Sequence, residues 1–469
     1  MWRIRVADLR DSWPAWGGVS LAFVTANYAF ATLALIINSG FVAVASGGVT
    51  LEKSAGFTVG PLTIVIMMCF VASTVIGAAT ALVITARRSA LARLALAGAT
   101  PAQVRGVLMT QLTAVSLASA VAADVLALVT LTSITDYIVF ARAGQGDAVV
   151  PPIHDVAPLL LANAGCLLVA LFGGARQLRR ASEIPPVAAL REAQLASPEG
   201  AMTRGRWVGV AALAALVAAF VVAVPVLVAR RDKETFSNLL VLDWMLLFVS
   251  GALLAALAPV LVGGLTRWWT GLIPWRAPSW RLARATVGAK ADRLVRSVTP
   301  VMFTIGITLG DQAMGASLLA TLDRSGLDIP LSNTGWESFL MIFGLPFLVA
   351  LAGSVGVLVM MSKQRDAELA LAGIVGATPG QRLILPALEA VIITGTAALL
   401  ALGMVVPTLA YQAYAFTALG LAFAPAVPWG PALVALAAGV LVTAAATVLP
   451  TLPALRQSEP RVIARLVAQ

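Results

Sequence analysis

Long apolar stretches separated by short polar segments constrain the fold of this chain more than any other feature. Hydrophobic residues make up 59% of the sequence and charged residues 12%, whereas an average soluble domain is about 25% charged. One helical crossing of a bilayer needs about 20 apolar residues. Stretches of that kind cover about residues 19–37, 61–85, 107–133, 156–174, 208–228, 241–265, 298–322, 339–361, 382–410 and 430–452. We therefore predict an all-α polytopic membrane protein with ten transmembrane helices.

The positive charges sort to one side of the membrane when the N-terminus is placed inside. Of the 32 Lys and Arg residues, 26 then fall in inner segments, as the positive-inside rule requires. The outer loops hold the remaining six, which are Lys53, Arg142, Arg230, Arg231, Lys233 and Arg324. This sorting predicts that both termini are cytoplasmic. It also explains the net charge of +10 by topology, so we expect membrane lipid and no nucleic acid as a partner.

The N-terminal segment predicts a surface helix followed by a retained span. Residues 1–10 are basic and amphipathic, which is typical of a helix lying on the cytoplasmic membrane surface. The Ala-Val-Ala sequence at 43–45 resembles a signal-peptide cleavage site. The apolar stretch before it is longer than the roughly 7–15 residues of a signal sequence, so we expect this segment to remain in the protein.

A short motif recurs at a fixed distance along the chain. Gly-Ala-Thr-Pro occurs at residues 98–101 and again at 376–379, a separation of 278 residues. At this separation the first four predicted spans match the last four, and an even number of spans lies between the copies. The sequence therefore predicts two parallel repeats related by an axis along the membrane normal. We expect a four-span unit at 1–192 that includes the N-terminal helix, a linker with two connector spans at 193–275, and a second four-span unit at 276–469.

Each copy of the motif predicts a helix that stops and another that starts at once. Gly98 and Gly376 are expected helix stops, because glycine adopts the left-handed conformation at little cost. The residues that follow suit a capping box with proline in the first turn. The expected N-caps, first helical residues and capping partners are Thr100, Pro101 and Gln103, and Thr378, Pro379 and Gln381. An ordinary loop is the alternative, but the same chemistry in two copies favours a bent helix pair.

Three aspartates lie within apolar runs, where a carboxylate is costly and usually faces a cavity or a partner. We expect Asp124 and Asp311 to lie on a substrate path or proton relay, with an interhelical hydrogen bond as an equal alternative. For Asp243 the hydrogen bond or an interfacial position is favoured. Asn27 and Asn163 are expected to bond between helices.

Other candidate groups give no catalytic or metal site. Cys69, Cys166 and His154 have no metal-ligand spacing, and phosphate-binding and hydrolase motifs are missing. We therefore expect no metal, no bound cofactor and no enzyme activity of the chain itself. Tryptophans near the predicted span ends indicate an aromatic belt. They are Trp13, Trp16, Trp207, Trp244, Trp268, Trp269, Trp336 and Trp429.

The two motif copies resemble the FtsX-like permease family, the macrolide-exporter or type VII class of ABC transporters, in a ten-span plan similar to bacitracin exporters. The resembling segments are 93–100, 368–378, 186–191 and 460–465. The resemblance implies a permease subunit in a bacterial plasma membrane. It also implies a separate cytoplasmic ABC ATPase, in two copies, that holds ATP and Mg. By resemblance, the coupling elements contain Arg93, Gly98, Ala99, Thr100, Glu368, Gly376, Ala377 and Thr378, and Pro101, Gln103, Pro379 and Gln381 complete the two bends.

Two departures from the family shape the expected function. Glu368 keeps the family's glutamate eight residues before the motif glycine, but Ala90 replaces it in the first copy. The outer loops are too short for the folded external domain of relatives, which favours a lipophilic or amphipathic substrate (antibiotic, peptide or lipid) met within the membrane. We expect ATP-driven export or extraction. The alternatives are a proton-coupled secondary transporter using Asp124 and Asp311, and a non-transporting sensor or scaffold driven by an ATPase.

Overall fold

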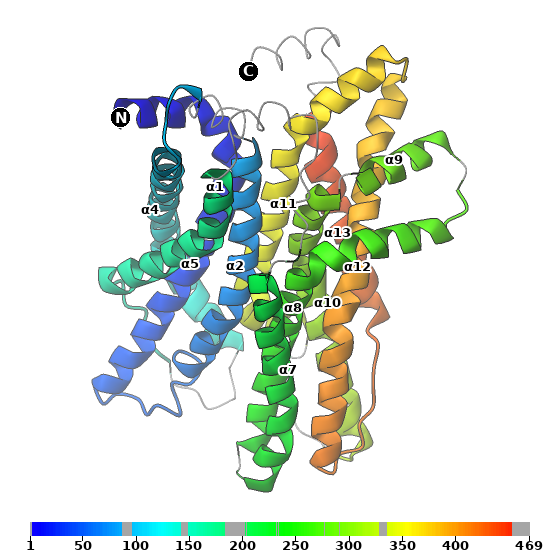
Figure 1. Ribbon diagram of the computed structural model, residues 1–469. Helices are drawn as coiled ribbons and strands as arrows, with labels where there is room; N and C mark the ends of the chain where they lie inside the picture. The colour runs from blue at the N-terminus through cyan, green and yellow to red at the C-terminus, as the bar shows by residue number, and fades with distance from the viewer. Residues whose placement is uncertain are drawn as a thin grey trace.

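The computed structural model describes residues 2–86, 96–141, 149–182, 204–230, 234–275, 277–289, 291–327 and 335–452, together with residues 202 and 232. All regular structure within these residues is helical (Figure 1). Arg93, Ala90 and the segments 186–191 and 460–465 lie outside the described residues.

Each predicted apolar stretch falls on one long helix, except that the last, 430–452, extends a few residues beyond its helix. These helices are α1 (Trp2–Ala45), α2 (Val59–Ala86), α4 (Pro101–Ala141), α5 (Val156–Ser182), α7 (Arg204–Arg230), α8 (Thr235–Leu272), α10 (Ala291–Arg324), α11 (Trp336–Ile374), α12 (Pro379–Ala418) and α13 (Trp429–Val448). The short helix α9 (Pro278–Ala289) precedes α10, and a 3-10 turn, η1 (Leu449–Thr451), follows α13.

Eight of the described helices are long and apolar enough to cross a membrane. The two long helices outside this set are α5, whose described apolar part Val156–Leu171 is shorter, and α10, which carries Asp311 and Gln312. The prediction of an all-α polytopic membrane protein is confirmed. The count of ten spans is not.

The helices pack in two groups that meet mainly through α11, and α2 also contacts α8 and α10. Helices α1, α2, α4 and α5 pack against one another, and α10, α11, α12 and α13 form a second group. Helix α11 also contacts α1 and α2 across the junction, while α8 packs on α10 and α12 and carries α7 on its outer side. The predicted connector helices therefore attach mainly to the second group.

Glycines bring the two groups into close backbone contact. A side-chain carbon built on Gly18 of α1 or on Gly356 of α11 would collide with the backbone of the other glycine. A carbon on Gly353 would likewise overlap Val75 of α2. Small residues allow helices in a membrane to approach this closely, so α1, α2 and α11 form a tight junction.

The two segments around the Gly-Ala-Thr-Pro copies, which we call the elbows, lie at the same end of the bundle. We call this end the elbow end. Helices α4 and α12 both begin there, at Pro101 and Pro379, and the N-terminal part of α1 crosses the same end (Figure 1). Helices α1, α4, α10 and α12 run from the elbow end to the opposite, far end, and α2, α8 and α11 run back. From these directions, a residue's position in its helix tells whether it lies near the elbow end or near the far end.

Candidate functional site

The second elbow, residues 371–381, joins α11 to α12 by two standard caps. The N–H of Gly376 donates to the Gly373 carbonyl at 3.0 Å, and the N–H of Ala377 donates to the Ala372 carbonyl at 2.9 Å. With Gly376 at φ +100°, this is a Schellman motif that ends α11. Thr378 and its partner Gln381 then form a capping box that opens α12.

The first elbow, residues 96–103, has the same construction where it is described. Gly98 has φ +90°. The N–H of Thr100 donates to Gln103 Oε1 at 2.9 Å, and the N–H of Gln103 donates to Thr100 Oγ1 at 3.3 Å. The matching distances at Thr378 and Gln381 are 3.0 and 3.3 Å. The capping boxes predicted in both copies are confirmed, and so is the helix stop at Gly376, where the ordinary-loop alternative is wrong. Before the first elbow, residues 87–95 lie outside the described part of the chain.

Both elbows present apolar side chains at the surface. Leu96 of the first elbow is 51% exposed, and Leu371, Ile374 and Val375 of the second are 57, 60 and 88% exposed. Gly98, Thr100, Gly376, Thr378 and Gln381 are also exposed, whereas Glu368 is half-buried and has an interaction partner. Each elbow is thus a rigid, exposed turn with an apolar surface.

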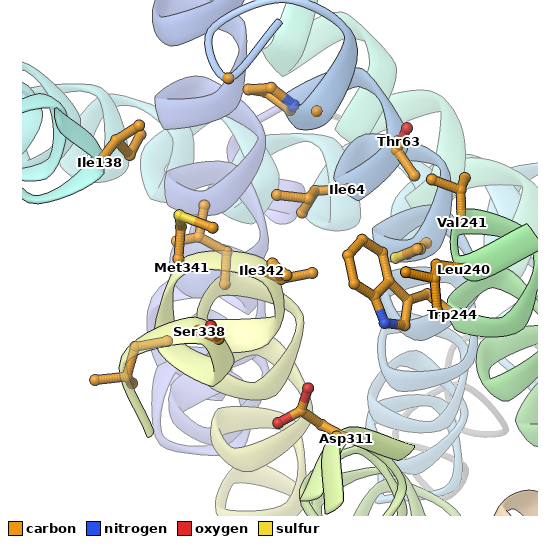
Figure 2. A pocket seen from close by; sticks show the side chains of 18 of the residues that line it. Thr63, Ile64, Ile138, Leu240, Val241, Trp244, Asp311, Ser338, Met341 and Ile342 are labelled. Carbon is orange, nitrogen blue, oxygen red and sulfur yellow. The ribbon is translucent and has the colours of Figure 1, made fainter. Parts of the chain in front are cut away.

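A cavity of about 1300 Å³ lies toward the far end. It is lined by the far halves of helices from both groups and by α8, including Tyr28 of α1, Tyr137 of α4, Trp244 of α8, Asp311 of α10 and Met341 of α11. Figure 2 shows side chains from several of these helices surrounding one open space. The Gly18–Gly356 contact lies nearer the elbow end than this cavity, so the cavity lies on the far side of the tight junction.

Asp311 supplies the only formal charge among the described side chains that line the cavity. Its Oδ2 accepts a hydrogen bond from Gln312 Nε2 at 3.0 Å, and its carboxylate points toward the space in Figure 2. The cavity wall also includes Gln412 of α12, whose Nε2 donates to the Met314 carbonyl at 3.1 Å. Gln412 Oε1 is buried and has no partner among the described residues.

Trp244 belongs to the cavity wall, a position that its assignment to an aromatic belt did not predict. Its ring packs edge-on against Phe343 with centroids 6.1 Å apart, and Phe343 stacks on Phe248 at 5.8 Å. Phe343 and Phe248 are fully buried. The aromatic contacts therefore fix the indole in place at the edge of the cavity.

Asp124 has a different environment from Asp311. Asn163 Nδ2 of α5 donates to Asp124 Oδ2 of α4 at 2.8 Å, and Asp124 is not among the cavity-lining residues. This bond is the interhelical alternative weighed from the sequence, and it also places Asn163 as expected. Asn27, in contrast, donates to the Phe23 carbonyl of its own helix at 2.8 Å, so its expected bond between helices is not observed.

Asp243 is buried without a hydrogen-bond partner among the described residues. Its side chain is 1% exposed, and neither carboxyl oxygen has a partner. Leu239 and Leu246 lie on the same buried face of α8. The hydrogen bond favoured from the sequence is therefore absent among the described residues.

No cluster of potential metal ligands occurs in the part of the chain that the structure describes. The described elbow residues lie together at one end of the bundle, and Asp311 lines a cavity near the other end. Sequence reasoning missed Trp244, Gln312 and Gln412 as cavity residues. The clearest sequence signal for the cavity wall was the polarity of α10, which is the least apolar of the ten long helices.

The fold and the two sites define a polytopic, all-helical membrane protein with paired elbows at one end and a cavity toward the other. A family model for the FtsX-like permease C-terminal region matches residues 62–186 and 340–458, together more than half of the chain. The chain belongs to the FtsX-like permease family. Members of this family are membrane subunits of ABC transporters, which work with an ATPase partner and generally lack an ATPase site of their own. No curated protein matches this sequence.

Proposed function

We propose that this chain is the permease subunit that couples ATP hydrolysis by a separate ATPase to the export or extraction of a lipophilic or amphipathic molecule. Two ATPase copies would dock at the two elbows and hold the ATP and Mg, and the chain would bind no cofactor itself. The family resemblance supports a bacterial plasma membrane as the location, and the charge sorting supports an elbow end that faces the cytoplasm. The internal repeat and the 1–192, 193–275 and 276–469 division belong to the same proposal.

The single observation that carries this proposal is the matching construction of the two elbows at one end of the bundle. Helices α4 and α12 begin at Pro101 and Pro379 and end at Ala141 and Ala418, so each elbow is continuous with a helix that spans the bundle. A capped, hydrogen-bonded turn transmits a displacement, whereas a flexible loop absorbs it. The exposed apolar residues Leu96, Ile374 and Val375 offer a surface that a soluble subunit would cover.

The mechanism follows from the position of the junction between the two groups. Closure of the ATPase subunits would push both elbows, and the rod-like helices would tilt about the contact of Gly18 and Gly356. The cavity lies on the other side of that contact, so its width would change in the opposite sense. Asp311 would meet the substrate there, while Asp124 serves α4–α5 packing through Asn163.

The test is the double variant Gly98→Val and Gly376→Val, assayed with the partner ATPase in proteoliposomes. Valine at these positive φ angles strains each turn by about 1–2 kcal/mol, which should distort the elbows that transmit the ATPase displacement. ATP hydrolysis should therefore continue without transport. The matched control is Gly47→Val with Gly420→Val, because these glycines have φ +72° and +81° at the far end. Coupled transport in the elbow variant, or equal loss in the control, would contradict the proposal.

A further inference from the structure

We propose that the far-end cavity binds an amphipathic molecule with a single positive charge, and that Asp311 is the residue that selects for this charge. The inference rests on the proposed transport function and names its substrate class. It assigns Asp311 a specificity role in binding and uses no proton transfer.

The charge balance of the cavity favours a cation. Asp311 lies on a cavity wall formed largely by apolar residues, and none of the described lining residues is Lys, Arg or His. A carboxylate in a low-dielectric site attracts an opposite charge strongly, and it repels an anion by a similar amount. The cavity therefore discriminates by the sign of charge before any detail of shape is considered.

The neighbouring polar groups add electronegative atoms to the same wall. Met314, whose carbonyl accepts from Gln412, lies three residues beyond Asp311 and so on the same face of α10. The amide oxygen of Gln412 has no partner among the described residues.

Trp244 provides the second feature that a cation would use. Its indole lines the cavity and is fixed by Phe343, as described above. Figure 2 shows Trp244 and Asp311 entering the space from α8 and α10. The electron-rich face of an indole attracts cations, and Ile64, Met341 and Ile342 offer an apolar surface for the rest of the molecule.

The volume admits a bulky amphipathic molecule, and the charge count limits how many positive charges it can carry. About 1300 Å³ exceeds the roughly 300–1000 Å³ of ordinary small-molecule pockets. The single charged residue among the described lining makes a polycationic ligand unsuitable, since every further charge would be buried without a partner.

The experiment measures equilibrium binding of two ions that share a shape and differ in charge sign. Tetraphenylphosphonium and tetraphenylborate are titrated against the purified full-length chain in a neutral detergent. We expect tetraphenylphosphonium to bind at least tenfold more tightly than tetraphenylborate. Asp311→Asn, which keeps the side-chain shape, should remove that preference, and Asp311→Glu should retain it.

Asp124→Asn is the matched control, because it neutralises a carboxylate on α4 that does not line the cavity. It should leave both affinities within about twofold. Trp244→Leu should weaken the cation severalfold and leave the borate unchanged. Equal binding of the two ions by the natural sequence, or an unchanged preference in a folded Asp311→Asn protein, would overturn the inference.

The two proposals fail in different ways. The elbow variants Gly98→Val and Gly376→Val should bind tetraphenylphosphonium normally while losing ATP coupling. If Asp311 controls the charge preference but the elbow variants still transport, the coupling proposal is wrong and the binding site stands. If the elbow variants uncouple but the ions bind alike, the binding site is wrong and the coupling proposal stands.

Discussion

At the residue scale, Asp243 is a buried carboxyl group that the packing does not satisfy. Both of its oxygens are unpartnered within the described residues, and Leu239 and Leu246 flank it on the same face. Burying a polar group without a hydrogen bond costs roughly 1–3 kcal/mol in proteins. A group kept at that cost is expected to serve something other than stability.

Asp243→Leu should therefore raise the stability of the purified chain, by about 1–3 kcal/mol. The substitution replaces an unsatisfied polar group by an apolar one between two leucines. Thermal unfolding in detergent measures the change, with Leu246→Ala as a variant that should lower stability by creating a cavity. A lower unfolding temperature for Asp243→Leu would show that the carboxyl is satisfied in solution.

The hydrogen bond between Asp124 and Asn163 should contribute modestly to the packing of α4 on α5. Interhelical hydrogen bonds in a membrane contribute about 0.6 kcal/mol on average, and at most about 1.7 kcal/mol. A double-mutant cycle with Asp124→Leu and Asn163→Leu should give a coupling energy in that range. A coupling near zero, or cation binding that falls with Asp124→Asn, would contradict a packing role.

At the element scale, the elbows were predictable because their structure is local. A glycine, a threonine, a proline and a glutamine at fixed spacing specify a helix stop and a capping box whatever surrounds them, and both copies adopt that structure. The cavity was not predictable in this way. Its residues come from helices far apart in the sequence, and Trp244 has the same local pattern as a tryptophan at a membrane interface.

The caps should stabilise the first turn of the helices that they open. Thr378→Ala should cost about 1 kcal/mol of local stability at the start of α12, and Thr378→Ser should cost much less. Hydrogen–deuterium exchange of the N–H groups at 380–382 measures this directly, since Pro379 has no N–H. Equal exchange rates in the alanine and serine variants would show that the side-chain cap does not hold the turn.

At the scale of the whole molecule, the two helix groups are held together at separate points along the bundle. Gly18 and Gly356 meet in backbone contact, and near the far end the Tyr137 hydroxyl donates to the Glu337 carbonyl at 2.9 Å. The cavity lies between the two groups near the far end, where its lining extends from α4 to α8. A tight glycine junction, with the Tyr137 hydrogen bond to α11 beyond it, is suited to opening and closing at the far end.

Gly356→Ala should separate the groups and destabilise the chain, because the added carbon has no room beside the Gly18 backbone. Overpacking of this kind costs about 1–3 kcal/mol. Gly344→Ala on the same helix is the control, since its nearest neighbour atoms would lie 3.9 Å away. It should be neutral or stabilising, because alanine is the better helix former by about 1 kcal/mol. A similar unfolding temperature for both variants would contradict a close-packed junction.

The central claim is that displacement of the elbows changes the width of the cavity at the other end. Spin labels at Val59 of α2 and Leu319 of α10, both exposed and on the cavity wall, measure that width in a background with Cys69 and Cys166 replaced. In the complex with its ATPase, the distance between the labels should shift when ATP binds, and the shift should vanish in the Gly98→Val, Gly376→Val variant. An unchanged distance on ATP binding, or a shift that persists in that variant, would contradict the account.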